Sequence, residues 1–489
     1  MYSKRPRLVM AALRGSAGKT TLAVALASAL KLRGHSVFTF KKGPDYIDAA
    51  WLSLAASNCC RNLDTYMTGH ERVMHSFAKF SRDDSISIVE GNRGLYDGVN
   101  AQGEHSTAAL AKLLNAPVIL VVDCDKVTRT MAAMVLGCIH LDRAVDIRGV
   151  ILNRVGGIRH AGVVSRAVEE SCGLPVLGSV PRIADIPFAE RHLGLIPPQE
   201  SMDGQRILKL AASIAEENID IDALIRVAND AQPLPEKDVT TRNMISLTDV
   251  QIGVIRDKAF QFYYPENLEE LARLGACLIR IDALQDSWLP DLDAIYIGGG
   301  FPEVHAERLS NNRSFLLSLR EAAENGLPVY AECGGLIYLG ISLHNNGRDF
   351  PMAGILPLRF EMEKKPQWHG YTDLEVDREN PFFPVGTSLR GHEFHYCRPT
   401  GYDDIDANTV FRIRRGLGFE GRRDGYCRKN ILAAFTHLHS LGMPEWAENM
   451  VARATRYKME KSAAIGRNAI QSYGKIGEGV INDSKLIYI

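Results

Sequence analysis

The stretch Arg14-Gly-Ser-Ala-Gly-Lys-Thr-Thr21 follows an apolar run at residues 7–13 and opens an amphipathic pattern at residues 19–33. The apolar run is typical of a strand, and the pattern after it is typical of a helix. A glycine-rich turn between the two directs backbone N–H groups toward a phosphate, and the helix dipole adds partial positive charge. An ordinary glycine-rich turn is the alternative, but the strand–turn–helix setting favours a nucleotide site.

The side chains of this stretch have the types that nucleotide binding requires. Lys19 can reach the β- and γ-phosphates, and the Thr20 hydroxyl can bind Mg²⁺. Leu13 stands where the standard pattern G-x-x-x-x-G-K-S/T has its first glycine, so the motif is a variant P-loop. Arg14 takes the place where some related loops carry a second lysine that faces the phosphates. The residues predicted to bind ATP here are Gly15, Gly18, Lys19, Thr20 and Thr21.

The first 230 residues alternate between short apolar runs and helical patterns. This alternation predicts a parallel sheet covered on both faces, and such sheets bind ligands at the carboxyl ends of their strands. We therefore predict an α/β fold whose first domain, residues 1–230, is a doubly wound, mostly parallel sheet with a P-loop. The predicted strands are residues 7–13, 36–40, 86–90, 117–123, 149–153 and 176–180, and the predicted helices include residues 19–33, 106–114 and 127–140.

The composition changes after residue 230. Residues 231–248 begin with two prolines and several charges and show no periodicity, which is typical of a linker. A second α/β pattern follows over residues 249–461, and residues 462–489 form a polar, glycine-rich tail with no predicted role. At about 150 residues per domain, a chain of 489 residues is long enough for two large domains. Strands of the second domain are predicted at residues 251–255, 293–297, 328–331 and 431–436.

Polar side chains follow three strands of the first predicted sheet. Asp45 and Asp48 come after one strand, and Glu90 and Asp97 come at and after another. Carboxylates at strand ends beside a P-loop can hold Mg²⁺ or position an acceptor group. The alternative is that Asp48 caps a helix and Asp97 lies in a turn. Asn153, at the end of a third strand, could present its amide to the edge of adenine.

Cys333 lies in Tyr330-Ala-Glu-Cys-Gly-Gly-Leu336, between a short strand and a helical run. A sharp turn at this place exposes the side chain, and we expect the start of the helix to lower the pKa of the thiol. A nucleophilic cysteine needs a base, and His437 and His439 lie at the end of the last predicted strand. Residues two apart on a strand face the same side, so both histidines could point into one site.

A second glycine-rich loop, Ile297-Gly-Gly-Gly-Phe-Pro-Glu303, follows a predicted strand and could supply backbone N–H groups to an oxyanion. Taken alone, Cys333 would more often be a buried core cysteine, and the two histidines could be a metal site. The combination of a cysteine turn, a histidine pair and two glycine loops favours thiol acyl-transfer catalysis.

The composition narrows the class of protein. The 57 Lys and Arg residues against 58 Asp and Glu give a net charge of −1, which argues against a nucleic-acid binder or an anionic-membrane anchor. The longest apolar run, residues 116–122, is far shorter than the ~20 residues of a bilayer span. The nine scattered cysteines form no C-x-x-C pair, which fits a reducing compartment. We expect a cytoplasmic protein, and the sequence leaves its oligomeric state open, an oligomer included.

These motifs together resemble the cobyrinic acid a,c-diamide synthase family. The first half is similar to the dethiobiotin-synthetase-like ATP-binding fold, and the second half resembles class I glutamine amidotransferases. The order of the motifs between residues 10 and 440 makes the match specific. The matching stretches are RGSAGKTT, KKGPDYIDAAW, EGNRGLYDG, APVILVVD, ILNRV, YIGGGFPE, AECGGLIYL, GHEFHY and THLH.

The resemblance implies a glutamine-dependent amidoligase. Cys333 would attack glutamine and release ammonia, with His437 as general base and acid. ATP, with Mg²⁺, would phosphorylate a side-chain carboxylate of a tetrapyrrole, cobyrinic acid above all, and ammonia would displace the phosphate at the a and c positions in turn. The acidic residues above match the family's acidic motifs, and backbone amides near Gly299, Gly300 and Gly334 would hold the oxyanion.

One departure from the class I pattern and two alternatives to the proposed substrate and reaction are considered. Class I amidotransferases usually carry Glu two residues after the histidine; that place is His439 here, which suggests a Cys–His dyad in which either histidine could be the base. Hydrogenobyrinic acid or nickel-sirohydrochlorin could replace cobyrinic acid with the same chemistry. A switch ATPase of the MinD/ParA kind would explain the P-loop alone, but it gives no reason for the cysteine and histidine motifs.

Overall fold

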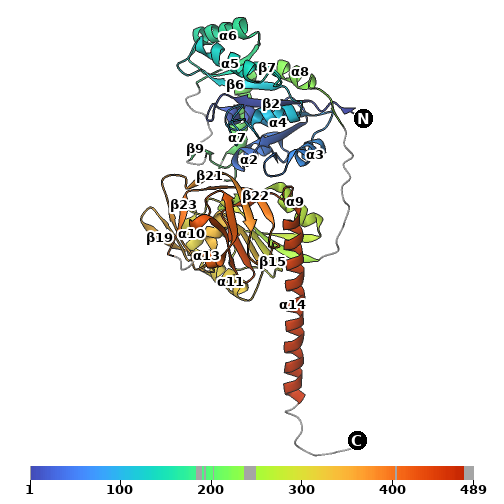
Figure 1. Ribbon diagram of the computed structural model, residues 1–489, viewed down its shortest axis with the longest axis vertical. Helices are drawn as coiled ribbons and strands as arrows, with labels where there is room; N and C mark the ends of the chain where they lie inside the picture. Colours follow the sequence, from blue (N-terminus) through green and yellow to red (C-terminus); the bar gives the residue numbers. More distant parts are fainter. Residues whose placement is uncertain are drawn as a thin grey trace, which may run out of the picture. The chain divides into compact units, whose positions relative to one another are not determined.

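The computed structural model describes residues 2–182, 190–191, 194–201, 203–235, 249–401 and 405–477. The chain divides into two compact units, residues 1–242 and 243–489, and each is described by itself (Figure 1). Most of the predicted linker, residues 236–248, and the end of the predicted tail, residues 478–489, lie outside the described residues. Among the described residues, none of the helices is both long and apolar enough to cross a bilayer.

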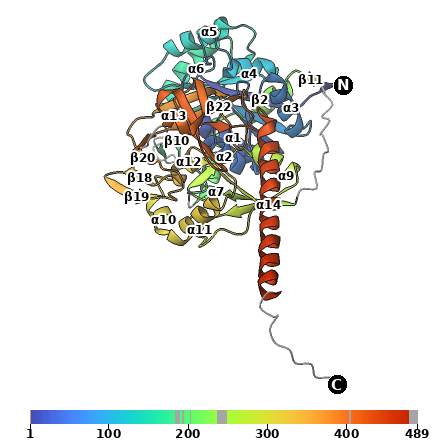
Figure 2. The same ribbon diagram turned by 60° about the horizontal axis from the view of Figure 1, so that its bottom comes forward.

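The first unit contains a seven-stranded sheet in which every pairing is parallel. All residues of the central strand β2 are buried, which requires helices on both faces and confirms the predicted doubly wound α/β fold (Figure 2). In spatial order the strands are β4 (Arg61–Leu63), β3 (Val37–Lys42), β5 (Ile86–Glu90), β2 (Arg7–Ala12), β6 (Val118–Asp123), β7 (Ile147–Val155) and β8 (Val176–Pro181).

The helices of the first unit alternate with these strands. The predicted helix at residues 19–33 is α1, which packs against α2 and α7. Two short pairs complete the unit: β1 (Tyr2–Ser3) with β11 (Leu234–Pro235), and β9 (Glu190–Arg191) with β10 (Gly194–Leu195). The helices are α1 (Lys19–Leu32), α2 (Ile47–Ala56), α3 (His70–Phe80), α4 (Thr107–Leu113), α5 (Thr130–Leu141), α6 (Ile158–Cys172), α7 (Gly204–Asn218) and α8 (Ile221–Asn229).

The second unit is built on a ten-stranded mixed sheet, parallel in its first half and antiparallel in its second. Its parallel strands are β14 (Ala276–Ile281), β12 (Val250–Ile255), β15 (Ala294–Ile297), β17 (Val329–Glu332) and β26 (Ile431–Ala434). Its antiparallel strands are β25 (Arg423–Arg428), β24 (Thr409–Arg415), β21 (Trp368–Val376), β22 (Ser388–His395) and β27 (His437–Leu438).

The remaining elements of the second unit are short, with one exception. Helix α14 (Pro444–Gly477) is a single long helix in Figure 1 and Figure 2, and it includes the first part of the predicted tail. The shorter helices are α9 (Pro265–Arg273), α10 (Ala306–Asn311), α11 (Arg313–Glu324), α12 (Gly334–Leu339) and α13 (Ile405–Asn408). The remaining strands are β13 (Phe260–Phe262), β16 (Gly299–Gly300), β18 (Ser342–Asn345), β19 (Arg348–Pro351), β20 (Arg359–Met362) and β23 (Cys397–Thr400).

The strand predicted at residues 431–436 ends two residues early. The buried Asp424 carboxylate accepts hydrogen bonds from the backbone N–H groups of Phe435 and Thr436, at 2.9 and 3.1 Å. These amides therefore cannot pair with a neighbouring strand, and β26 stops at Ala434. The chain then crosses to β22, where it forms the short strand β27 that carries His437.

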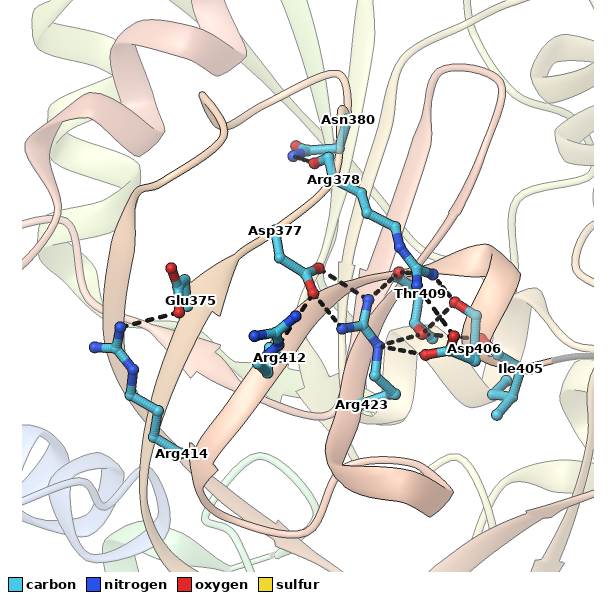
Figure 3. Close-up of polar contacts among 10 residues, drawn as sticks. All are labelled: Glu375, Asp377, Arg378, Asn380, Ile405, Asp406, Thr409, Arg412, Arg414 and Arg423. Atoms are coloured by element: carbon cyan, nitrogen blue, oxygen red, sulfur yellow. Dashed lines mark hydrogen bonds and ion pairs between the residues drawn. The ribbon is translucent and has the colours of Figure 1, made fainter.

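A buried arginine ties together the antiparallel half of this sheet (Figure 3). The Arg423 guanidinium donates to both oxygens of Asp377, at 2.6 and 2.9 Å, and to the Thr409 hydroxyl at 3.1 Å. Asp406 lies 3.3 Å away on the other side. Burial opposes ionisation of Asp377, but the Arg423 hydrogen bonds and charge outweigh it and lower the pKa of that carboxyl. The paired groups are therefore charged in the folded protein.

We predict that Arg423→Met lowers the free energy of unfolding of this unit by about 3 kcal/mol, because the partly buried Asp377 loses both hydrogen bonds from Arg423 and is left with the exposed Arg412, at 3.4 Å. Arg414→Met is the matched control, since Arg414 forms an exposed pair with Glu375 and its loss should cost about 1 kcal/mol or less. Urea unfolding followed by circular dichroism measures both. Equal effects of the two substitutions would contradict the prediction.

The same pair predicts a pH dependence. Asp377 has a lowered pKa in the folded state, so its contribution is complete above the unfolded pKa of about 3.9 and is lost as the pH falls through the folded value. The stability difference between the wild type and Arg423→Met should therefore be constant from pH 7 to 5 and shrink below about pH 4.

Candidate active sites

The P-loop joins β2 to α1 through a left-handed turn. Gly18 precedes the helix with φ +88° and ψ 16°, a conformation that favours glycine. The buried Lys19 begins the helix, and its ammonium donates to the carbonyl oxygens of Arg93, at 2.7 Å, and Arg14, at 3.3 Å. The Arg14 side chain instead pairs with Asp123 at 2.8 Å. Lys19 is thus held across the concave side of the loop, where a phosphate-binding lysine is needed.

Asn153 holds the other side of the loop. Its amide nitrogen donates to the Ala17 carbonyl at 2.9 Å, and its oxygen accepts from the backbone N–H of Arg154 at 3.0 Å. A Cβ atom added to Gly18 would lie 2.2 Å from this amide nitrogen, so only glycine fits there. Gly15, by contrast, is exposed and has nothing within 4 Å of such an atom. Asn153 therefore braces the P-loop, and its predicted contact with adenine stays a prediction.

Two of the predicted carboxylates converge on the first turn of α1, which also contains Thr21. The Thr20 hydroxyl donates to Glu90 at 2.6 Å and lies 3.1 Å from Asp48. The ammonium of Lys41 lies in the same cluster, 2.6 Å from Asp48 and 2.8 Å from Glu90. Because β3 continues two residues beyond its predicted end, Lys41 is part of the strand and reaches these carboxylates.

The other two carboxylates have backbone partners. Asp45, two residues before α2, accepts a hydrogen bond from the N–H of Asp48 at 2.9 Å, and Asp48 lies in the first turn of α2 rather than at its N-cap. The capping alternative considered for Asp48 is therefore wrong. Asp97 accepts from the N–H of Gly94 at 2.8 Å, as expected of a turn residue. Asp97 nevertheless lies close enough to Lys19 for its charge to act on the pKa of that lysine.

Burial and neighbouring charges shift the pKa values of this cluster. Burial raises the pKa of Glu90, although the neighbouring Lys41 opposes the shift. Burial acts in the same direction on Asp48, but there Lys41 outweighs it and lowers the pKa. Burial and the charge of Lys41 together lower the pKa of Lys19 to about 8. The cluster thus holds two buried ammonium groups beside oxygen ligands, which suits a highly charged anion such as a triphosphate.

The oxygen atoms of this cluster fit a magnesium ion. Mg²⁺ binds through one or two carboxylates together with substrate phosphates rather than in an all-protein cage. Glu90, Asp48 and the Thr20 hydroxyl supply such oxygens, and Glu90 Oε2 is buried without a hydrogen-bond partner. Within the described residues, no group of three or more His, Cys, Asp or Glu side chains is arranged to hold a metal alone. A magnesium ion here would therefore need the nucleotide as a further ligand.

We predict that Gly18→Ala weakens ATP binding about tenfold or more, because the new methyl group collides with Asn153 and the φ of +88° is strained for alanine. Gly137→Ala is the control, since Gly137 lies in α5 and has nothing within 4 Å of an added Cβ. Isothermal titration calorimetry with ATP measures both affinities. Wild-type affinity in Gly18→Ala would contradict this view of the loop.

In the second unit, Cys333 occupies a strained turn between β17 and α12. Its φ of 49° and ψ of −101° are unusual for a residue with a side chain, and strain of this kind concentrates at functional positions. The Cys333 amide donates to the Ala434 carbonyl at 2.7 Å, which extends the pairing of β17 with β26 by one residue. The sharp strand-to-helix turn is therefore present as expected. The prediction that it exposes the side chain is wrong, because Cys333 is buried.

The expected lowering of the Cys333 pKa is wrong for the protein without substrate. Burial raises the pKa of the thiol, and the charges of Glu303, Glu393 and Glu332 raise it further. Helix α12 has only six residues, and its partial charge does not offset desolvation beside three carboxylates. Cys333 is therefore a protonated thiol in this state, and nucleophilic attack requires a base that takes its proton.

The three glycines predicted to bind an oxyanion lie together, and His437 lies against them. A Cβ atom on Gly334 would be 3.0 Å from the backbone nitrogen of Gly300. A Cβ atom on Gly299 would be 2.5 Å from Cε1 of His437 and 3.2 Å from its Nε2. The absence of side chains at these positions therefore brings backbone N–H groups, the imidazole and the residue after Cys333 into close contact.

His437 is fixed by a carboxylate and by a second histidine. Its Nδ1 atom lies 3.5 Å from the buried carboxylate of Glu332. Its ring stacks on His392 of the neighbouring strand, with centroids 4.8 Å apart and planes 9° from parallel. Burial, together with the nearby histidines, keeps the pKa of His392 well below its usual range, so His392 is neutral. The Nε2 atom of His437 is left facing the glycine loop.

His439 has a different environment. Its ring lies against Tyr264, with centroids 4.4 Å apart, and its Nε2 atom lies 3.7 Å from Glu266. Its Nδ1 atom accepts a hydrogen bond from the N–H of Leu441 at 3.2 Å. The contacts of His439 are therefore with Tyr264, Glu266 and Leu441, whereas His437 lies against the glycine loop.

Sequence reasoning missed three side chains of these sites. Lys41 is adjacent to the predicted carboxylates, but the strand was expected to end before it. Glu332 directly precedes Cys333, and a charged residue at the end of an apolar strand was the signal available. His392 belongs to the quoted stretch GHEFHY, yet only its pairing with β27 reveals that it contacts His437.

Comparison with known proteins agrees with both units. Residues 8–196 match the model of the CobQ/CobB/MinD/ParA nucleotide binding domain. Residues 251–444 match the model of the CobB/CobQ-like glutamine amidotransferase domain. Each match covers the sheet and the glycine-rich turns described above, and together they support the two-part fold.

Curated relatives match the chain over nearly its whole length. The chain is 41% identical to the cobyrinate a,c-diamide synthase of Magnetococcus marinus, over 90% of this chain and 96% of that protein. It is 40% identical to the synthase of Archaeoglobus fulgidus, over 93% and 98%. It is 37% identical to the synthase of Caldanaerobacter subterraneus subsp. tengcongensis, over 92% and 98%. The resemblance read from the motifs is confirmed, and the chain belongs to the cobyrinate a,c-diamide synthase family.

Proposed function

We propose that this protein uses ATP and glutamine to convert the a- and c-side-chain carboxylates of cobyrinic acid into amides, a step of cobalamin biosynthesis. The observation that carries the proposal is the presence of two complementary sites in one chain. A P-loop with buried cations and carboxylates supports phosphoryl transfer. A strained cysteine beside a histidine and a glycine loop supports release of ammonia from glutamine.

The cysteine site would hydrolyse glutamine in two steps. Cys333 loses its proton to Nε2 of His437 and attacks the side-chain amide, which forms a γ-glutamyl thioester and releases ammonia once the proton is passed to the leaving nitrogen. Water then cleaves the thioester to glutamate with His437 as base. Backbone N–H groups of Gly299, Gly300 and Gly334 stabilise the oxyanion of each step. His437 is the better base because its ring lies against Gly299, whereas the contacts of His439 are with Tyr264, Glu266 and Leu441.

The P-loop site would activate the acceptor. The tetrapyrrole carboxylate attacks the γ-phosphate of ATP, ADP leaves, and ammonia then displaces phosphate from the acyl phosphate to give the amide. Activation is needed because direct attack of ammonia on a carboxylate would have to expel an oxide. Lys19 neutralises the charge that is transferred, and Asp48, Glu90 and Thr20 would hold Mg²⁺. When bound, that ion would neutralise the phosphate oxygens. Asp45 and Asp97 would position the acceptor.

Two other readings use the same sites differently. Hydrogenobyrinic acid and nickel-sirohydrochlorin carry similar peripheral carboxylates, and the roles proposed above concern those carboxylates and not the ring metal. A switch ATPase of the MinD/ParA kind would share the nucleotide-binding unit, but it would not need a strained cysteine beside His437. The two other rings would change the substrate of the proposed reaction, whereas the switch ATPase would be a different reaction.

We expect mass spectrometry to find two successive amidations of cobyrinic acid after incubation with ATP, Mg²⁺ and glutamine. Hydrogenobyrinic acid and nickel-sirohydrochlorin are incubated in parallel, and omission of ATP is the control. If only another ring is amidated, that ring and not cobyrinic acid is the substrate. ATP hydrolysis without ammonia release from glutamine would favour the switch.

We further predict that one substitution in each site has a different effect on ammonia-dependent synthesis. Cys333→Ala should abolish glutamine-dependent synthesis, by about 10³-fold or more, and leave ammonia-dependent synthesis within about twofold of the wild type. Lys19→Ala should abolish synthesis from either nitrogen source, because the phosphoryl transfer is lost. Product formation is measured with glutamine and, separately, with ammonium chloride. Equal loss of both activities in Cys333→Ala would contradict the division of labour.

A further inference from the structure

We propose that Glu332 is the residue that positions His437, in place of the carboxylate that class I amidotransferases carry two residues after the histidine. The inference rests on the proposed glutamine hydrolysis and adds a residue to it. Glu332 is the last residue of β17 and is completely buried. It lies one residue before Cys333, and its Oε2 atom lies 3.5 Å from Nδ1 of His437.

Hydrogen-bond donors surround the Glu332 carboxylate. Oε1 accepts from the backbone N–H of Leu438 at 3.0 Å and lies 3.3 Å from the Tyr330 hydroxyl. Oε2 accepts from the Tyr296 hydroxyl at 2.9 Å, and His437 is its second neighbour. A carboxylate that accepts hydrogen bonds on both oxygens is held in one orientation by its donors. The same contacts fix its position, so Glu332 cannot turn away from the imidazole.

The charge of Glu332 fixes the tautomer of His437. A hydrogen on Nδ1 faces the carboxylate, which leaves the lone pair on Nε2, the atom beside Gly299. Nε2 is then the acceptor for the Cys333 proton, and Glu332 stabilises the imidazolium that forms without becoming protonated. The proton passes from Sγ of Cys333 to Nε2 of His437 and then to the nitrogen that leaves as ammonia, so Glu332 takes no part in the proton transfer itself.

A second buried pair in the same unit is the natural comparison. Glu266 is also buried, and it lies 3.7 Å from Nε2 of His439. The Nδ1 atom of His439 already accepts from the Leu441 amide, so this pair presents no free nitrogen to the glycine loop. Both Glu–His pairs are buried, and they differ in what the histidine faces. Glu266→Gln therefore controls for the loss of a buried carboxylate as such.

The test compares Glu332→Gln with Glu266→Gln in the full-length protein. We expect Glu332→Gln to lower kcat for glutamine hydrolysis by about 10²-fold or more, with KM for glutamine within about threefold of the wild type. Ammonia-dependent synthesis should be unchanged, which shows that the protein is folded. Glu266→Gln should hydrolyse glutamine within about threefold of the wild-type rate. A normal kcat in Glu332→Gln, or an equal loss in Glu266→Gln, would overturn the proposal.

Tyr296→Phe provides a milder variant in case Glu332→Gln does not fold. It removes one donor that fixes the carboxylate while keeping the aromatic ring, and we expect kcat to fall by about tenfold with KM unchanged. Wild-type kcat in this variant would then overturn the proposal. A wild-type protein that releases no ammonia from glutamine would instead refute the proposed function itself, so the two failures are distinguishable.

Discussion

The hydrogen bond from the Cys333 amide to the Ala434 carbonyl is the contact on which the cysteine site depends. It continues the parallel pairing of β17 with β26 beyond the end of β17, and it fixes the backbone at the point where the chain turns sharply into α12. Asp424 then removes the next two amides from the sheet, which redirects the chain toward β22 and brings His437 to the glycine loop. The positions of nucleophile, base and loop thus follow from one strand pairing and one buried carboxylate.

The nucleotide site is built on the same principle at the other sheet. Its functional groups lie at the carboxyl ends of parallel strands. A tight turn that only glycine allows leads there from strand β2 into the first turn of helix α1. Gly18 supplies the turn, and Asn153 keeps it closed through the Ala17 carbonyl. The extra two residues of β3 carry Lys41 into the carboxylates. A cation of the protein therefore neutralises those carboxylates.

The two sites contain buried groups of opposite charge beside their reactive residues. The P-loop site gathers buried ammonium groups, so it favours a polyanion and compensates the carboxylates that would hold a metal. The cysteine site gathers carboxylates around a buried thiol, which raises the pKa of Cys333 and prevents it from ionising before substrate binds. The thiol then depends on a positioned base rather than on a thiolate formed in advance. This contrast explains why the histidine must be held rigidly, by Glu332 on Nδ1 and by the stacked His392.

The sequence by itself determined the α/β class, the P-loop, the nucleophile turn and the family, because these depend on local patterns: a glycine-rich turn after an apolar run, and residue types at fixed spacing. The ten strands that it predicted agree with observed strands to within two residues, but it predicted none of the antiparallel strands β21 to β25. Only the tertiary structure decided which carboxylates meet Lys41, that Asp45 binds the backbone N–H of Asp48, and that Glu332 lies beside His437. Those contacts join residues from strands far apart in the chain, so register and strand length set them, and neither can be read from local sequence. The raised pKa of Cys333 could not be predicted from local sequence either, because burial and carboxylates that are mostly distant in the chain cause it.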